Sequence, residues 1–65
     1  MVMKTYIIYE YDGDYRYELT TDWTDPEIAD QFNEEDLEEM KDLDVGEMYM
    51  ICDLGIELGM VTRVA

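Results

Sequence analysis

Apolar residues dominate two short runs near the start of the chain, residues 4–11 and residues 15–20. Both runs are rich in tyrosine and in β-branched residues, which are enriched in strands. The polar residues 12–14, Asp-Gly-Asp, lie between them and are typical of a tight turn. The pattern therefore predicts a β-hairpin.

The register of this hairpin depends on the length of its loop. A three-residue loop, residues 11–13, places Gly13 where a left-handed backbone is needed and pairs Tyr9 with Tyr15. It gathers apolar side chains on one face, namely Ile7, Tyr9, Tyr15, Tyr17 and Leu19. The opposite face then carries Tyr6, Ile8, Glu10, Arg16 and Glu18. The alternative is a two-residue loop, Asp12-Gly13, which would shift the pairing by one residue and mix charge into the apolar face.

A helical segment is predicted to begin at Pro26. Asp25 can accept hydrogen bonds from the free amides of a helix N-terminus, and proline suits the first helical position. Apolar residues then recur at helical spacing, at Ile28, Ala29, Phe32, Leu37, Met40 and Leu43. The spacing slips near Asn33, itself a good helix cap, so the segment forms either one bent helix or two short helices. Gly46 is the expected stop.

The C-terminal part of the chain predicts a second hairpin. Residues 47–53 are apolar on both alternating faces, which is typical of a strand in the middle of a sheet, and residues 56–64 follow with Gly55 and Gly59 available for a turn or bulge. The expected fold class is α+β. We predict a small antiparallel four-stranded sheet in ββαββ order, with one bent or split acidic helix packed on one face, forming one domain over residues 1–65.

Composition narrows the class of protein. The chain has 65 residues, a net charge of −14 and 48% hydrophobic residues, more than a solvated acidic tail would need. Cys52 is the single cysteine, which excludes an internal disulfide, and we expect it to be a small buried core thiol. No apolar run approaches the roughly 20 residues of a membrane span. We therefore expect a folded cytoplasmic protein.

The chain contains few of the side-chain types that enzymes use for catalysis. Serine and histidine are absent, so no nucleophile has a neighbouring imidazole to activate it. A catalytic pair of carboxylates would need a cleft, for which a domain of this size has little volume. Asp12, Asp14 and Glu18 do not have the spacing of a calcium loop. We expect no enzymatic activity, no specific metal site and no cofactor.

Acidic residues are concentrated in one stretch of the chain. Between Asp22 and Glu47 twelve side chains are acidic, and Lys41 is the only basic one. Solvated helix faces usually mix both signs, so this excess predicts a basic partner. The same charge disfavours direct binding to nucleic acid and to anionic membranes. The candidate partner-binding carboxylates are Glu27, Asp30, Glu34, Glu35, Glu38, Glu39 and Asp42.

Carboxylates three and four residues apart on a helix approximate the spacing of backbone phosphates. We predict that this face imitates DNA and occupies the basic groove of a nucleic-acid-binding protein, which it inhibits or modulates. Trp23 is a candidate anchor at this interface, although packing under the helix N-terminus is its favoured role. In size and charge the chain is similar in kind to the inhibitors that phages and mobile elements make against host nucleases, glycosylases, restriction systems and CRISPR effectors. This similarity is one of composition, and it transfers no residue roles.

One helix covers one face of a sheet, so the other face remains exposed. In the predicted register that free face presents Tyr6, Ile8, Tyr49 and Ile51. Exposed apolar clusters commonly mark interfaces. The alternative function is therefore a structural or adaptor domain that forms a homodimer, or joins a larger assembly, through this face, with the acid serving solubility.

Overall fold

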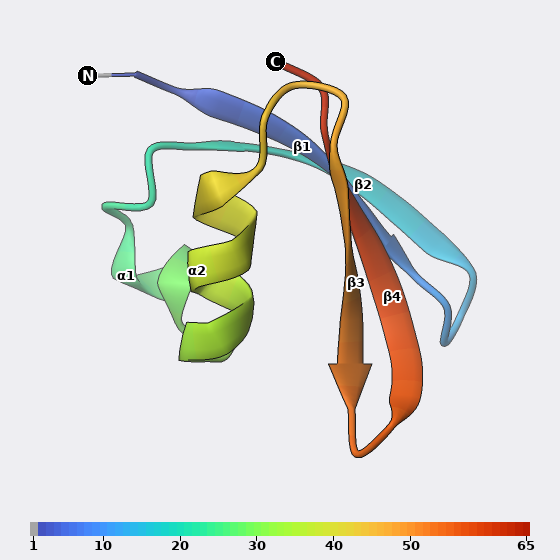
Figure 1. Cartoon of the computed structure of the whole chain (residues 1–65). Helices are drawn as coiled ribbons and strands as arrows, with labels where there is room; N and C mark the ends of the chain where they lie inside the picture. The colour runs from blue at the N-terminus through green and yellow to red at the C-terminus, as the bar shows by residue number, and fades with distance from the viewer. Residues whose placement is uncertain (1) are drawn as a thin grey trace.

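The computed structural model describes residues 2–65 and has an α+β fold, in which two short helices lie on one face of a four-stranded antiparallel sheet (Figure 1). The elements follow the predicted order, with the helical segment between two hairpins. They are β1 (Lys4–Glu10), β2 (Tyr15–Thr21), α1 (Pro26–Ala29), α2 (Glu34–Asp42), β3 (Met48–Asp53) and β4 (Ile56–Arg63). The predicted fold class is confirmed.

The two hairpins join through their inner strands, which gives the strand order β2-β1-β4-β3. β1 pairs with β4 from Tyr6 opposite Arg63 to Glu10 opposite Gly59. The prediction that residues 47–53 form a middle strand is wrong, because β3 lies at an edge. Its apolar residues on both faces have another cause. Tyr49 packs against the core beneath the helices, whereas Met50 lies near the Tyr11 hydroxyl on the opposite face.

The register of the first hairpin differs from the favoured prediction. Tyr9 lies opposite Arg16, not Tyr15, which is the one-residue shift that a two-residue Asp12-Gly13 loop produces. The Asp14 N–H donates to the Tyr11 carbonyl oxygen across this turn at 3.2 Å, and Gly13 has a φ of 87°. The favoured register was wrong because burial in the core decides which residues of β1 and β2 face the helices. Local turn chemistry does not reveal that burial.

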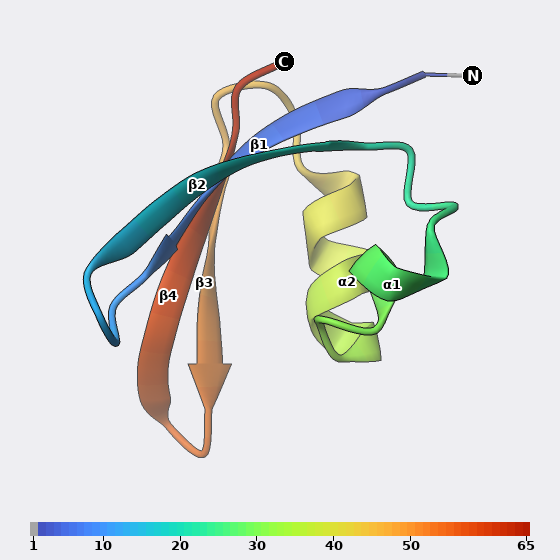
Figure 2. The same cartoon turned by 180° about the vertical axis from the view of Figure 1, so that it is seen from behind.

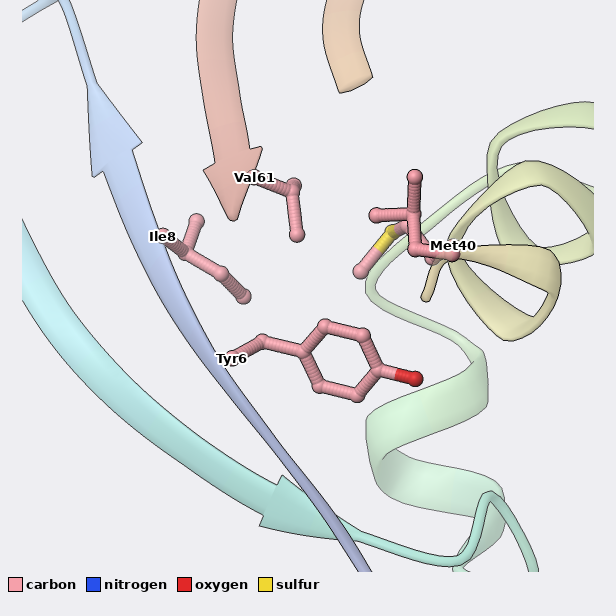
Figure 3. Packing of buried hydrophobic residues seen from close by; sticks show 5 residues of the cluster. Tyr6, Ile8, Met40 and Val61 are labelled. Atoms are coloured by element: carbon pink, nitrogen blue, oxygen red, sulfur yellow. The ribbon is translucent and has the colours of Figure 1, made fainter. Parts of the chain in front are cut away.

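The core lies between the sheet and α2. Its buried members are Tyr6, Ile8, Met40, Leu43 and Val61. In Figure 3 the side chains of Tyr6, Ile8 and Val61 point from the sheet toward Met40. The predicted faces are thus exchanged for β1, whereas Tyr17 and Leu19 of β2 now share the core face with Tyr6 and Ile8. Tyr6, Ile8, Tyr49 and Ile51, expected on the free face, belong to the core or pack against it.

The helical segment is split into two helices, as one of the two predicted alternatives required. The Asp25 carboxylate accepts the Glu27 N–H at 2.9 Å at the start of α1, and the Asn33 side-chain oxygen accepts the Asp36 N–H at 2.8 Å at the start of α2. α2 ends at Asp42, before the expected stop at Gly46. Gly46 instead has a φ of 91° and lies in the connection to β3, where its N–H donates to a β4 carbonyl oxygen.

Candidate functional site

The surface of α2 that faces away from the sheet carries the predicted row of carboxylates. Glu34, Glu38 and Asp42 are spaced by four residues, which places them along one side of the helix, and Glu35 and Glu39 flank them. All seven predicted partner-binding carboxylates are exposed, namely Glu27, Asp30, Glu34, Glu35, Glu38, Glu39 and Asp42. Glu27 lies in α1 and Asp30 caps its C-terminus, so these two extend the acid beyond α2. We call Glu34, Glu35, Glu38, Glu39 and Asp42 the acidic row.

Helix electrostatics explain one end of the acidic row but not the other. Glu34 and Glu35 lie in the first turn of α2, where the free amides and the helix dipole favour negative charge. Glu38, Glu39 and Asp42 lie farther along, and Asp42 is the last residue of the helix. The C-terminal end of a helix dipole favours cations and disfavours acid. The helix dipole therefore does not account for the acid at Asp42.

Three of the four basic residues contact groups other than the acidic row. The Lys4 ammonium donates to the carbonyl oxygen of Lys41 at 2.8 Å, and the Arg63 guanidinium donates to that of Leu43 at 2.8 Å. Both cations thus bind carbonyl oxygens at the C-terminal end of α2, as helix capping favours. The Arg16 guanidinium lies 5.1 Å from the centre of the Tyr9 ring. Lys41, the fourth basic residue, lies in the last turn of α2, so this helix carries the five carboxylates of the acidic row and one basic side chain.

Asp36 is the acidic residue of α2 that faces the core. It is 6% exposed, and its carboxylate accepts a hydrogen bond from the Tyr49 hydroxyl at 2.7 Å. That hydrogen bond, together with burial and the nearby negative charges, raises the pKa of Tyr49 from 10.0 to about 12. Asp36 is not among the predicted partner-binding carboxylates, and no core role was predicted for it. Its spacing of four and seven residues from Met40 and Leu43 was the available signal.

Trp23 lies where the chain enters α1. Its indole N–H donates to the Tyr6 hydroxyl at 3.3 Å, and its ring centre is 5.4 Å from that of Tyr6 and 6.3 Å from that of Phe32. Its backbone N–H also donates to the Thr21 hydroxyl at 2.9 Å. Trp23 is half-buried, and these contacts give it the packing role favoured by the sequence.

The face of the sheet opposite the helices is uncovered by any part of residues 2–65 (Figure 2). It has a shallow hollow of about 340 Å³ that is mostly apolar. Its lining includes Ile7, Tyr9, Met60 and Val64, with Arg16 and Thr62. These residues replace the set predicted for the free face, because the Tyr6 and Ile8 side of β1 packs under the helices and the Ile7 and Tyr9 side is left uncovered.

Cys52 is exposed, so the expectation of a buried core thiol is wrong. It lies on an edge strand, directly after the irregularity in pairing between Ile51 and Cys52. Within residues 2–65, no three acidic or cysteine side chains are grouped closely enough to hold a metal ion. No helix in the described part of the chain is long and apolar enough to cross a membrane.

Comparison with models of known protein families, with curated proteins and with solved structures finds no match to this chain. The function is therefore inferred from the geometry and charge of the chain itself.

Proposed function

We propose that this protein is a small acidic binding protein that inhibits or modulates a basic nucleic-acid-binding protein by imitating nucleic acid. One observation carries the proposal. The acidic row continues to the C-terminal residue of α2, Asp42, where the helix dipole makes acid unfavourable. Five exposed carboxylates on a helix with one basic residue leave an excess of negative charge, which a basic partner best explains.

The density of charge on α2 supports this interpretation. The nine residues of α2 carry the five exposed carboxylates of the acidic row. At a rise of about 1.5 Å per residue, they supply about one charge per 3 Å of helix axis. A single DNA strand has one phosphate per roughly 3.4 Å, and a duplex has one per roughly 1.7 Å. The acidic row thus has the charge density of one strand.

The chemistry of the partner follows from that of the acidic row. Lysine and arginine side chains that bind phosphates also bind carboxylates, and arginine can bind either with two parallel hydrogen bonds. A nuclease, a glycosylase, a restriction enzyme or a CRISPR effector presents such side chains in a groove, and a phage or mobile element is the expected source of an inhibitor of this kind. The protein would occupy this groove and exclude the nucleic acid without carrying out any chemistry.

A pull-down from bacterial lysate with three baits tests the proposal. The first is the wild-type chain. The second carries Glu38→Gln, Glu39→Gln and Asp42→Asn, which keep the helix N-terminus intact. The control carries Glu18→Gln, Asp53→Asn and Glu57→Gln, which remove the same number of exposed charges elsewhere.

We expect the wild-type and control baits to recover the same nucleic-acid-binding protein at low salt, and the acidic-row variant to lose it. Recovery should also fall at high salt, because exposed charges are screened beyond about 8 Å near physiological ionic strength. Equal recovery by the acidic-row variant and the wild-type chain would reject the proposal.

The uncovered sheet face supports a second candidate, a structural or adaptor domain that forms a homodimer. Two copies packed back to back would bury Ile7, Tyr9 and Met60 and leave both acidic faces outward. Packed sheets lie about 10 Å apart, and each helix layer adds about 10 Å, so the acidic faces would be more than a Debye length apart. Sedimentation of wild type and Met60→Glu tests this candidate. A wild-type dimer that the substitution dissociates would support it, and a wild-type monomer at high concentration would reject it.

A further inference from the structure

An apolar groove of about 330 Å³ opens on the helix side of the sheet, next to the start of the acidic row. Figure 1 shows that the end of β3 and the start of β4 extend beyond α2. The helix layer therefore does not cover this part of the sheet. The apolar lining includes Ile8, Phe32, Ile51 and Leu58.

Gly59 creates the floor of this groove. It lies opposite Glu10 on β1 and opposite Ile51 on β3, so these three positions share one face of the sheet. A Cβ atom on Gly59 would overlap the Tyr9 carbonyl oxygen, which keeps this position free of a side chain. The result is a gap between two neighbouring side chains, Glu10 and Ile51.

The second hairpin supplies the apolar wall. The pairing of β3 with β4 shifts between Ile51 and Cys52, and Leu58 is the residue that the shift leaves without a partner. Leu58 lines the groove and is 47% exposed. Phe32, one residue before the cap of α2, lines it as well and is half-buried. The groove thus presents apolar surface that no described residue fully covers.

The charged residues lining the groove are acidic. Glu10 and Asp12 line it, and both are exposed. Glu34 and Glu35 follow Phe32 closely in the chain, so the acidic row begins beside the groove. Apolar surface surrounded by one sign of charge complements a partner segment that is basic and carries an apolar side chain.

We propose that this groove receives one leucine or aromatic side chain from the basic partner, so that the complex has an apolar anchor beside its charged contacts. The inference rests on the proposed function and adds a source of specificity for one basic partner over others. Ligand sites commonly measure about 300–1,000 Å³, so this groove has room for a side chain and little more. Buried anchors of that kind dominate interface energetics, whereas exposed charge contributes mainly to the rate and the salt dependence of association.

Two synthetic nine-residue peptides separate the groove from the acidic row. Each has lysine at eight positions, and the central residue is tryptophan in one and serine in the other. Both are titrated into ¹⁵N-labelled wild-type protein at physiological salt, and the amide shifts and the affinity are measured. We expect both peptides to shift the amides of α2. Only the tryptophan peptide should also shift those of Phe32, Ile51 and Leu58, and it should bind about tenfold more tightly.

Two variants test whether the groove causes the difference in affinity between the two peptides. Leu58→Ser should reduce the preference for the tryptophan peptide to less than about twofold. Leu54→Ser removes the same side chain from the neighbouring turn, where Leu54 is 94% exposed, and should leave the preference intact. If Leu58→Ser does not fold, the amide shifts of the wild-type protein alone show whether the tryptophan binds in the groove.

The outcomes distinguish the two proposals. Equal affinities for the two peptides, with shifts confined to α2, would reject the proposal of an anchor in the groove. The proposal that the acidic row binds a basic partner would remain. Tryptophan-dependent shifts at Ile7 and Met60 would place the anchor on the uncovered sheet face and would also reject an anchor in the groove. If neither peptide bound, both proposals would fail.

Discussion

At the scale of single residues, one hydrogen bond separates Asp36 from the other acids of α2. Its carboxylate is buried and accepts the Tyr49 hydroxyl at 2.7 Å, whereas its acidic neighbours are exposed. The pair connects α2 to an edge strand. A buried polar group without its partner costs more than the hydrogen bond itself contributes, so Tyr49 is the more informative of the two to mutate.

We expect Tyr49→Phe to lower the free energy of unfolding by about 1–3 kcal/mol, because Asp36 would lose its donor within the core. Urea denaturation followed by circular dichroism measures this change. Tyr15→Phe is the matched control, since Tyr15 is 56% exposed. A loss in the control as large as that in Tyr49→Phe would contradict this assignment.

The same pair makes stability sensitive to alkaline pH. The hydrogen bond to Asp36 raises the pKa of Tyr49 from 10.0 to about 12, so the folded state holds the proton more tightly than the unfolded state does. This contribution is fully present below pH 10 and is lost as the pH rises toward 12. Urea midpoints at pH 9 and pH 11 should differ more in wild type than in Tyr49→Phe. Equal differences would show that other tyrosines account for the effect.

At the scale of elements, local chemistry was predictable and pairing was not. Asp25 and Asn33 act as helix caps as the sequence indicated, because a cap is decided by a few neighbouring residues. The first hairpin adopts the alternative register, and β3 lies at an edge, because both depend on contacts between segments distant in sequence. The acidic row follows from helical periodicity, whereas the groove depends on Gly59 lying between Glu10 and Ile51 of other strands.

Asp42 tests the balance between stability and function in α2. We expect Asp42→Asn to raise the free energy of unfolding by roughly 0.3–1 kcal/mol, because it removes acid from the C-terminal end of the helix dipole. Glu18→Gln relieves the overall charge to the same extent on an exposed position of β2, so it serves as the control. No gain beyond that of Glu18→Gln in thermal denaturation would mean that Asp42 carries no cost for the helix.

At the scale of the whole molecule, a net charge of −14 on 65 residues opposes a compact state. The buried core of such a chain is small, so its stability is limited. Repulsion between its carboxylates lowers the free energy of unfolding further. Much of this charge lies on the helix side of the sheet, whereas the uncovered face has Arg16 next to Ile7 and Tyr9. The molecule therefore presents one surface suited to a basic partner and another suited to apolar contact.

Salt should stabilise the free protein. The Debye length falls from about 30 Å at 0.01 M to about 8 Å at 0.15 M ionic strength, which screens repulsion between the exposed carboxylates. We expect the melting temperature to rise over this range, and to rise less in the variant with Glu38→Gln, Glu39→Gln and Asp42→Asn. A melting temperature that stays constant or falls in wild type would contradict a fold under electrostatic repulsion.

The central claim is that the acidic row takes the place of nucleic acid, and competition on the recovered partner tests it most directly. The partner is bound to immobilised wild-type protein, and single-stranded or duplex oligonucleotides are added at constant ionic strength. We predict mutual exclusion. The oligonucleotide should release the partner completely, and saturating protein should block oligonucleotide binding. A stable ternary complex of partner, oligonucleotide and protein would contradict nucleic-acid mimicry and assign the acidic row to a different surface of its partner.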